Sequence, residues 1–437
     1  MTKLLRARGG LRRVPAVWVG WAIARLCLAM LIKLNHQPRG DLFYYHVAIF
    51  GSNPQDMTEY PHAGTWPTYL AAWLGGSEIM AFMFVFALFC LACDAAFLAA
   101  LLHRHDTRPT AFTAAWFWVL FGLAAGHVFV MRLDIFPGLA VGFAALVIHR
   151  WPVLSSSLIA LACAMKLWPG VLAAGLVGRA TNARAWLRLL TFGVSLVAFA
   201  GITLLSGGWE RLTSPLDYQN VRGLQIESVA ATPYMWDAYR HPAAYELGIA
   251  PSKSFEITGA GTDGAVQATT WAMGIVIAFA LLWALYRFIW GGWSPQTTIS
   301  WAAVVVLGLI VTNKVFSPQY IIWFGPLIAV ALRTTTPGSA RRKVVAILGV
   351  MTVVCAGLGT YIYPFGYDYL WNFVGEQLAP VAALVARNVL VVAMFVFTLV
   401  WWVLELRAQV LERREIKELG QPGGATQSEG AHERAQA

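Results

Sequence analysis

The chain has 437 residues, of which 58% are hydrophobic, 13% aromatic and only 12% charged. Because an ordinary soluble domain carries roughly 25% charged residues, this composition excludes a soluble enzyme, a fibrous protein and a disordered chain. The formal net charge of +10 does not indicate nucleic-acid binding, because the basic residues lie at the ends of apolar runs and not along one soluble face.

Apolar runs long enough to cross a bilayer, which takes about 20 residues, recur along the whole chain. They are residues 14–34, 79–102, 111–131, 135–149, 187–206, 269–290, 297–313, 319–332, 344–363 and 381–404. Residues 151–178 form two shorter stretches, separated at Lys166-Leu167-Trp168-Pro169, that either cross the membrane or re-enter it. We therefore expect an all-α polytopic membrane protein, with about 10–12 transmembrane helices in one domain over residues 1–404.

The distribution of basic residues predicts the orientation of these spans. Most of the 32 Lys and Arg residues lie in the N-terminal segment, in one set of short loops and after residue 404. The positive-inside rule then places both termini in the cytoplasm, and the large loops 35–78 and 207–268 on the external face of the cell membrane. The first run lacks a signal-peptidase site, so we expect an anchor. The tail 405–437 is charged and then rich in Gly, Gln, Ser and Ala, so we expect a disordered cytoplasmic segment.

The sequence offers no cofactor or disulfide pattern. All five cysteines lie in apolar segments, where free cysteine behaves as a small hydrophobic residue, and the external loops contain none. No glycine-rich phosphate loop with its lysine is present. The residues therefore do not indicate a nucleotide site; Cys90 and Cys93 share one side of a helix, where a buried hydrophobic role is favoured over a metal or redox role.

The first external loop begins with a segment from Asp41 to Phe50 whose apolar residues recur at helical spacing, which predicts an amphipathic helix at the membrane interface. Asp41 would lie at its N-terminus, directly after the first span. Its side chain either caps the helix or acts as a general base at the bilayer edge. The loop ends with Glu59-Tyr60-Pro61-His62, a rigid turn at headgroup level in which His62 lies at a cleft or in solvent.

Charged residues within apolar segments are costly, and each is therefore a functional hypothesis. Lys166 either binds a phosphate group or extends to the external surface. Asp94 either pairs with Arg25 or takes part in catalysis. Arg132 and Asp134 lie in a tight external turn and are also compatible with a surface pair of little energetic weight.

Two later external segments combine polar and apolar residues. They are Arg222-Gly223-Leu224-Gln225-Ile226-Glu227-Ser228 and Asn313-Lys314-Val315-Phe316-Ser317-Pro318-Gln319-Tyr320. The proline of the second segment permits a broken helix start, and Gln319 and Tyr320 can hydrogen-bond a polar ligand. Ordinary turn chemistry explains this segment equally well.

Together these motifs resemble integral-membrane GT-C glycosyltransferases and, more narrowly, glycosyltransferase family 87, the actinobacterial polyprenyl-phosphate-mannose-dependent mannosyltransferases. Asp41-Leu42-Phe43-Tyr44-Tyr45 is similar to their Asp-x-x-x-Tyr start, and Lys166-Leu167-Trp168-Pro169 to their Lys-x-x-Pro. Glu59-Tyr60-Pro61 is similar to a Tyr-Pro-Pro element, but His62 replaces the second proline. Residues 222–228 and 317–320 are similar to two later motifs, and the likeness extends over residues 15–400.

The resemblance implies a GT-C-like bundle that transfers a hexose, mannose, from a polyprenyl-phosphate donor to a glycolipid or glycan acceptor at the external face, with inversion and without a cofactor. It implies Asp41 as general base, and Lys166 and Arg222 as ligands of the donor phosphate. The substrate-binding residues implied are Tyr44, Tyr45, Glu59, Tyr60, His62, Gln225, Glu227, Lys314, Gln319 and Tyr320. A transferase of arabinofuranose or another lipid-linked sugar remains open. A transporter or flippase of lipid-linked sugars would show inverted repeats, which the two halves of the sequence lack.

Overall fold

The computed structural model describes residues 13–35, 39–53, 56–102, 108–220, 222–250 and 253–419. Within these residues, seven helices are long and apolar enough to cross a membrane. They are α2 (Val14–Leu34), α5 (Ile79–Leu102), α10 (Ala183–Asn220), α12 (Thr262–Trp290), α13 (Pro295–Thr312), α15 (Ala340–Thr360) and α17 (Leu378–Leu419). The prediction of an all-α membrane protein is confirmed at this level.

Shorter elements complete the described chain. The apolar helices among them are α6 (Pro109–Ala124), α7 (Val128–Met131), α8 (Ile135–Val147), α9 (Pro152–Met165) and α14 (Ile321–Thr334). The loops contain α3 (Gly40–Phe50), α4 (His62–Gly75), α11 (Thr232–Arg240), α16 (Asp368–Trp371) and single-turn or irregular helices η2 (Trp168–Leu176), η3 (Pro242–Ala244), η4 (Pro318–Tyr320) and η5 (Tyr361–Phe365). The strands β1 (Tyr245–Ile249) and β2 (Phe255–Gly259) form an antiparallel hairpin.

Several predicted spans are interrupted or extended. The run 111–131 divides into α6 and α7 at Gly126, whose φ of +63° lies in the left-handed region that favours glycine. In the stretch 151–178, α9 ends at Met165, the following residue Lys166 is extended, and η2 begins at Trp168. The span predicted for 187–206 continues to Asn220, with a break at Gly208. The hairpin in the loop 207–268 was not predicted.

The tail prediction was wrong in its first part. Helix α17 continues without interruption to Leu419, so residues 405–419 are helical. This part is rich in Glu, Leu, Arg, Lys, Ala and Gln, all of which favour helix. The remainder of the predicted tail, 420–437, lies outside the described residues.

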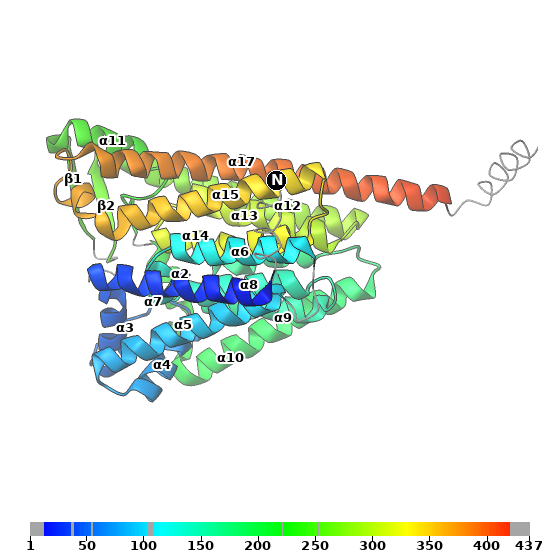
Figure 1. The fold of residues 1–437 in the computed structure, drawn as a ribbon, viewed down its shortest axis with the longest axis horizontal. Coiled ribbons are helices and arrows are strands. Elements are labelled where there is room, and N and C mark those ends of the chain that lie inside the picture. Colours follow the sequence, from blue (N-terminus) through cyan, green and yellow to red (C-terminus); the bar gives the residue numbers. More distant parts are fainter. Residues whose placement is uncertain are drawn as a thin grey trace, which may run out of the picture.

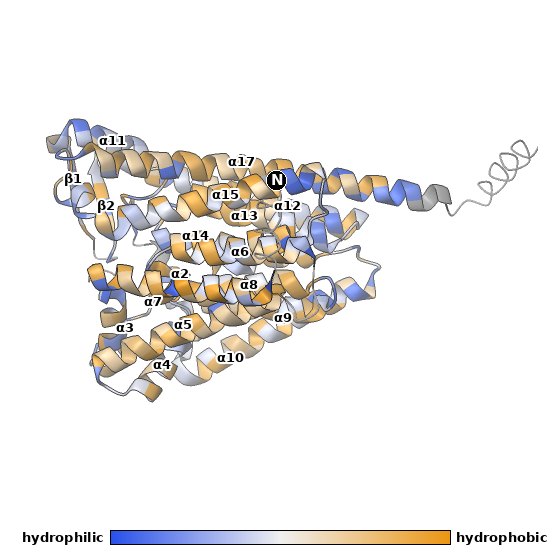
Figure 2. Cartoon of the chain, viewed as in Figure 1, coloured by the Kyte–Doolittle hydropathy of each residue, from blue (hydrophilic) through white to orange (hydrophobic). Residues whose placement is uncertain are grey.

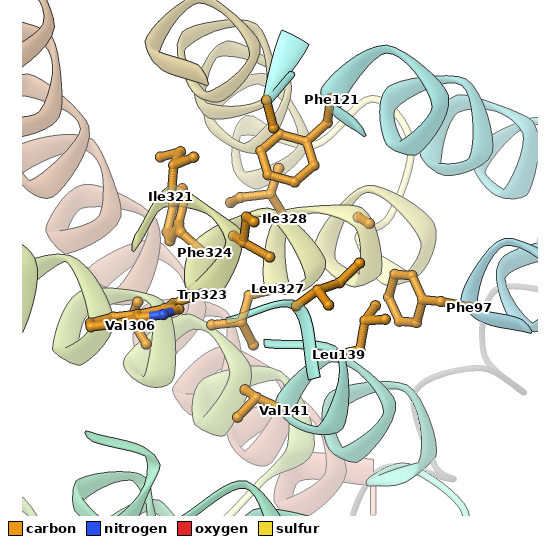
Figure 3. Packing of buried hydrophobic residues seen from close by; sticks show 14 of the residues in the cluster. Phe97, Phe121, Leu139, Val141, Val306, Ile321, Trp323, Phe324, Leu327 and Ile328 are labelled. Carbon is orange, nitrogen blue, oxygen red and sulfur yellow. The ribbon is translucent and has the colours of Figure 1, made fainter. Parts of the chain in front are cut away.

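The centre of the bundle is α14, whose residues from Ile321 to Leu332 are all buried. A helix that is apolar all round is typical of a bundle interior. Figure 3 shows its side chains Phe324, Leu327 and Ile328 surrounded by residues of neighbouring helices. Because Pro318 to Tyr320 lead directly into α14, the core fixes the position of the loop that precedes it.

The two large loops meet at one end of the bundle. Figure 1 shows α3, α11 and the hairpin β1–β2 at this end, whereas α17 projects beyond the opposite end. In Figure 2 hydrophilic residues gather toward the two ends and hydrophobic residues cover the helices between them. A second, smaller core joins α11 and the hairpin to the first turns of α17 through Met235, Ile257 and Leu384. This core holds the loop 222–259 against the bundle.

Arg25 of α2 and Asp94 of α5 form a buried ion pair within the bundle. Arg25 Nε lies 2.7 Å from Asp94 Oδ2, and Arg25 Nη2 lies 3.0 Å from Oδ1. The indole groups of Trp21 and Trp118 donate to the same carboxylate, each at 2.7 Å. The predicted partnership of Asp94 with Arg25 is therefore confirmed. Because every carboxylate oxygen is used, the pair has a structural role.

Candidate active site

A cavity of about 370 Å³ opens at the end of the bundle where the large loops meet. Its wall comes from segments far apart in the sequence. The lining residues are Asp41, Tyr44, Glu59, Tyr60, Arg132, Lys166, Tyr218, Arg222, Gln225, Glu227, Lys253, Ser254, Phe255, Val315, Ser317, Pro318, Gln319, Tyr320, Tyr363 and Tyr367. Most of the residues predicted from the sequence motifs are thus brought together.

Asp41 lies in the first turn of α3, but it does not cap the helix, because no side-chain hydrogen bond caps α3. Its carboxylate instead forms a salt bridge with Arg132 Nη1, while 39% of the Asp41 side chain stays exposed. Arg132 is only 5% exposed, and its Nη2 donates to the Tyr363 hydroxyl at 3.3 Å. The carboxylate is therefore held in position on one side and open to the cavity on the other.

Asp134 and Lys166 form a second pair beneath the cavity. Lys166 Nζ lies 2.5 Å from Asp134 Oδ1, which also accepts a hydrogen bond from Trp323 Nε1 at 2.6 Å. The ammonium lies 5.0 Å from the ring centre of Tyr320 and 4.9 Å from that of Trp323. Asp134 is 1% exposed, so the prediction that Arg132 and Asp134 form a weak surface pair was wrong. Arg132 pairs with Asp41, whereas Asp134 pairs with Lys166.

Arg222 is a cation of the cavity wall that hydrogen-bonds the side chains of Tyr218 and Tyr320. Its guanidinium lies 4.8 Å from the ring centre of Tyr218, and its Nε has no hydrogen-bond partner. Within the described part of the chain it forms no salt bridge with an acidic side chain. A half-buried guanidinium with no acidic partner among the described residues favours the binding of an anion.

Glu59 and Tyr44 form a polar contact on the wall beside α3. The Tyr44 hydroxyl donates to Glu59 Oε2 at 3.1 Å and accepts from the Met57 amide at 2.6 Å. Burial, together with the nearby Glu59 carboxyl, raises the pKa of Tyr44 to about 12. Burial also raises the pKa of Glu59. Lys253 Nζ lies 4.1 Å from the Tyr44 ring centre and 3.0 Å from Asp56 Oδ1, which closes this wall.

Gln225 and Glu227 line the cavity, but their polar groups bind the protein itself. Gln225 Oε1 accepts from the Phe316 amide at 2.7 Å. Glu227 Oε2 lies 2.6 Å from Arg387 Nη1, and both side chains are almost fully buried. The structure therefore assigns Glu227 to a buried ion pair that joins the loop 222–228 to α17, and not to an open position where it could orient a ligand.

Three predicted substrate-binding residues do not line the cavity. Tyr45 is fully buried behind it, with its hydroxyl 3.2 Å from that of Tyr60. His62 Nδ1 lies 3.2 Å from the Ser206 hydroxyl, and burial, together with Arg211, lowers its pKa. Lys314 also lies outside the lining, and burial lowers its pKa. By contrast, Gln319 and Tyr320 line the cavity from η4, as predicted.

Sequence reasoning missed several lining residues. The role of Arg132 was left open, with a surface pair as one alternative, although its place in a strongly apolar segment is the signal that marks a buried charge. Lys253 lies in a hairpin that was not predicted. Tyr363 and Tyr367 lie in an aromatic segment that is hard to distinguish from a membrane-interface belt.

Among the described residues, no group of three or more His, Cys, Asp and Glu side chains is arranged to hold a metal ion. Comparison with protein-family models, with curated proteins and with solved structures gives no match.

Proposed function

We propose that this chain is a GT-C-like membrane glycosyltransferase that transfers a hexose, mannose, from a polyprenyl-phosphate donor to a glycolipid or glycan acceptor at the external face. The observation that carries the proposal is the Asp41 carboxylate, which Arg132 holds at the edge of a cavity that also contains Lys166 and Arg222. A base beside several cations is the arrangement that attack on a sugar phosphate requires. The motif resemblance to glycosyltransferase family 87 gives the reaction class.

In the proposed reaction Asp41 accepts the proton of an acceptor hydroxyl while the hydroxyl oxygen bonds to the anomeric carbon. The bond from that carbon to the phosphate oxygen breaks on the opposite face, so the configuration inverts and the polyprenyl phosphate leaves with the electron pair. Arg132 forms a salt bridge with Asp41 that fixes the direction of the carboxylate. General-base catalysis of this kind contributes about 10²–10⁴-fold.

Arg222 is the proposed principal ligand of the departing phosphate, because it has no acidic partner among the described residues. Lys166 contributes less, because Asp134 already compensates its charge at 2.5 Å. Gln319, Tyr320 and Glu59 line the same cavity and are placed to hydrogen-bond sugar hydroxyls.

The alternative of a carrier for lipid-linked sugars is supported less well. Carriers bind their substrates near the middle of the membrane, between the helices. Here the cavity lies at one end of the bundle, and the charged pair between the helices, Arg25 and Asp94, is fully hydrogen-bonded. This pair therefore has no free hydrogen-bonding group of its carboxylate with which to bind a substrate between the helices.

The test is sugar transfer by the purified full chain reconstituted in vesicles, with polyprenyl-phosphate mannose as donor and an extracted envelope lipid fraction as acceptor. We expect Asp41→Asn to lower the rate by at least about 100-fold. The matched control Asp237→Asn changes an exposed aspartate on α11, outside the cavity, and should leave the rate unchanged.

Transfer that persists in Asp41→Asn would remove this residue from the mechanism. Translocation of the donor across the vesicle membrane without sugar transfer would refute the proposed enzyme and support a carrier. A parallel assay with polyprenyl-phosphate arabinofuranose identifies the donor sugar, since the cavity itself does not distinguish these two sugars.

A further inference from the structure

A second cavity, of about 440 Å³, lies between the C-terminal part of α12 and the last turns of α17. Helix α12 begins directly after the hairpin at the candidate active site and runs for 29 residues, which corresponds to about 43 Å. Its C-terminus therefore lies at the opposite end of the bundle, the end from which α17 projects (Figure 1). This second cavity, which we call the α12–α17 groove, is separate from the candidate active site.

Aromatic side chains form one wall of the α12–α17 groove. The rings of Trp283 and Tyr286 stack with their centres 5.5 Å apart, and those of Tyr286 and Trp290 lie 5.2 Å apart. Trp290 and Leu282 are each 65% exposed. A row of exposed rings that ends with the helix matches the depth at which aromatic side chains contact the lipid headgroups.

Two guanidinium groups, those of Arg287 and Arg413, approach the same point at the mouth of the groove. A Cβ built on Gly292 would lie 2.7 Å from Arg287 Nη1 and 3.3 Å from Arg413 Nη1, so both groups approach the same glycine. Gly292 has a φ of +83°, which turns the chain back toward α17. Among the described residues neither arginine forms a salt bridge with an acidic side chain, and the two charges repel one another.

We propose that the α12–α17 groove binds an anionic phospholipid of the surrounding bilayer, with its phosphate between Arg287 and Arg413. The acyl chain lies along Trp283, Tyr286 and Trp290, whose exposed faces continue toward the middle of the membrane. The phosphate supplies a counter-ion, which neither arginine has among the described side chains, and arginine binds phosphate oxygens in a bidentate manner. The apolar wall favours a lipid over a free phosphate ion.

The two arginines differ in how safely they can be changed. Arg287 is 4% exposed and donates to the Gly291 carbonyl at 3.3 Å and to the Thr297 hydroxyl at 3.1 Å, so it also stabilises the end of α12. Arg413 is exposed, and within the described part of the chain it makes no such hydrogen bond. The test therefore uses Arg413→Gln, and the matched control is Arg414→Gln, an exposed neighbour on α17 that does not line the groove.

The experiment measures the thermal stability of the detergent-purified full chain during titration with short-chain phosphatidylglycerol, phosphatidylcholine or inorganic phosphate. Because a ligand of the folded state stabilises it by an amount that grows with the logarithm of the ratio of ligand concentration to Kd, the titration of the melting temperature reports an apparent affinity. We expect phosphatidylglycerol to stabilise the protein more than phosphatidylcholine does, and inorganic phosphate to have no effect. One arginine near an anionic lipid contributes about fivefold in affinity, so Arg413→Gln should weaken phosphatidylglycerol binding by about that factor.

Equal weakening in Arg414→Gln would show a general effect of surface charge and would overturn the proposal. So would equal stabilisation by the two lipids, or stabilisation by inorganic phosphate alone. The proposal does not depend on the proposed function, because the groove and the candidate active site lie at opposite ends of the molecule.

Discussion

The ion pair between Glu227 and Arg387 offers a direct test of which residues are structural. Arg387 is 1% exposed, and its Nη1 lies 2.6 Å from Glu227 Oε2, while Nη2 donates to the Glu227 carbonyl at 2.5 Å. Glu227→Gln keeps the volume and one acceptor oxygen but removes the negative charge. Arginine stays protonated in a protein, so the change leaves a buried cation without a counter-ion.

Breaking a buried pair in this way costs about 3–5 kcal/mol. We expect the loss of stability in Glu227→Gln to be near the lower limit, about 3 kcal/mol, because the hydrogen bond from Arg387 to the Glu227 carbonyl remains. The matched control is Asp237→Asn, which removes the charge from an exposed pair with His241 and should cost less than about 1 kcal/mol. The measurement is unfolding by SDS in mixed micelles, followed by circular dichroism.

A double-variant cycle isolates the pair. Arg387→Met leaves the Glu227 carboxylate buried without its cation, whereas Glu227→Gln together with Arg387→Met removes both charges. We therefore expect the double variant to lose less stability than the sum of the single variants. If Glu227→Gln is no more destabilised than Asp237→Asn, the reasoning from burial is refuted. If transfer activity falls in a fully stable Glu227→Gln, the residue contacts the substrate, as the motif resemblance implied.

Three further variants test other parts of the structure. Asp94→Asn leaves Arg25 buried without its counter-ion and should cost about 3–5 kcal/mol in the same SDS titration, whereas a cost below about 1 kcal/mol would contradict the buried geometry. Gly64→Ala places a methyl carbon 2.2 Å from the Met165 carbonyl oxygen, so α4 and α9 must separate beside the cavity. We expect a lower melting temperature and lower transfer activity, and an unchanged melting temperature would show that the helices have room. Burial raises the pKa of Glu59, so its neutral form stabilises the folded protein, and this stabilisation is lost as pH rises through the raised pKa. The melting temperature of the wild type should therefore rise relative to that of Glu59→Gln as pH falls from neutral toward the ordinary glutamate pKa of about 4.3, and a pH-independent difference would exclude this shift.

The apolar runs alone predicted most of the fold. Seven of the ten predicted runs coincide with described helices long and apolar enough to cross a membrane, because the required length and the need to satisfy backbone groups within the helix are both visible in a single sequence. The runs 111–131, 135–149 and 319–332 form shorter helices, so the expectation of 10–12 transmembrane helices is not confirmed. The helix around Asp41 was also predicted correctly, since its apolar residues recur at helical spacing. Residues 405–419 were missed because their charge was given more weight than their helix propensity.

The sequence could not determine which charges neutralise each other. The sequence left a surface pair of Asp134 with its neighbour Arg132 open, but Asp134 pairs with Lys166, and Arg132 pairs with Asp41. Glu227 was predicted to contact a ligand, but Arg387 on the last helix occupies its carboxylate. Such partners come from helices that meet only after the bundle packs, so no local pattern records them.

The sequence by itself determined that the protein is built from apolar helices and which segments between them are polar enough to carry chemistry. Only the tertiary structure decided which polar groups remain open. Burial removes water from a charged group, and the group is then available to a ligand only if no other side chain compensates it. Asp41 is partly exposed and Arg222 has no acidic partner among the described residues, so both are open to a ligand. Glu227 is compensated by Arg387 and therefore has a structural role.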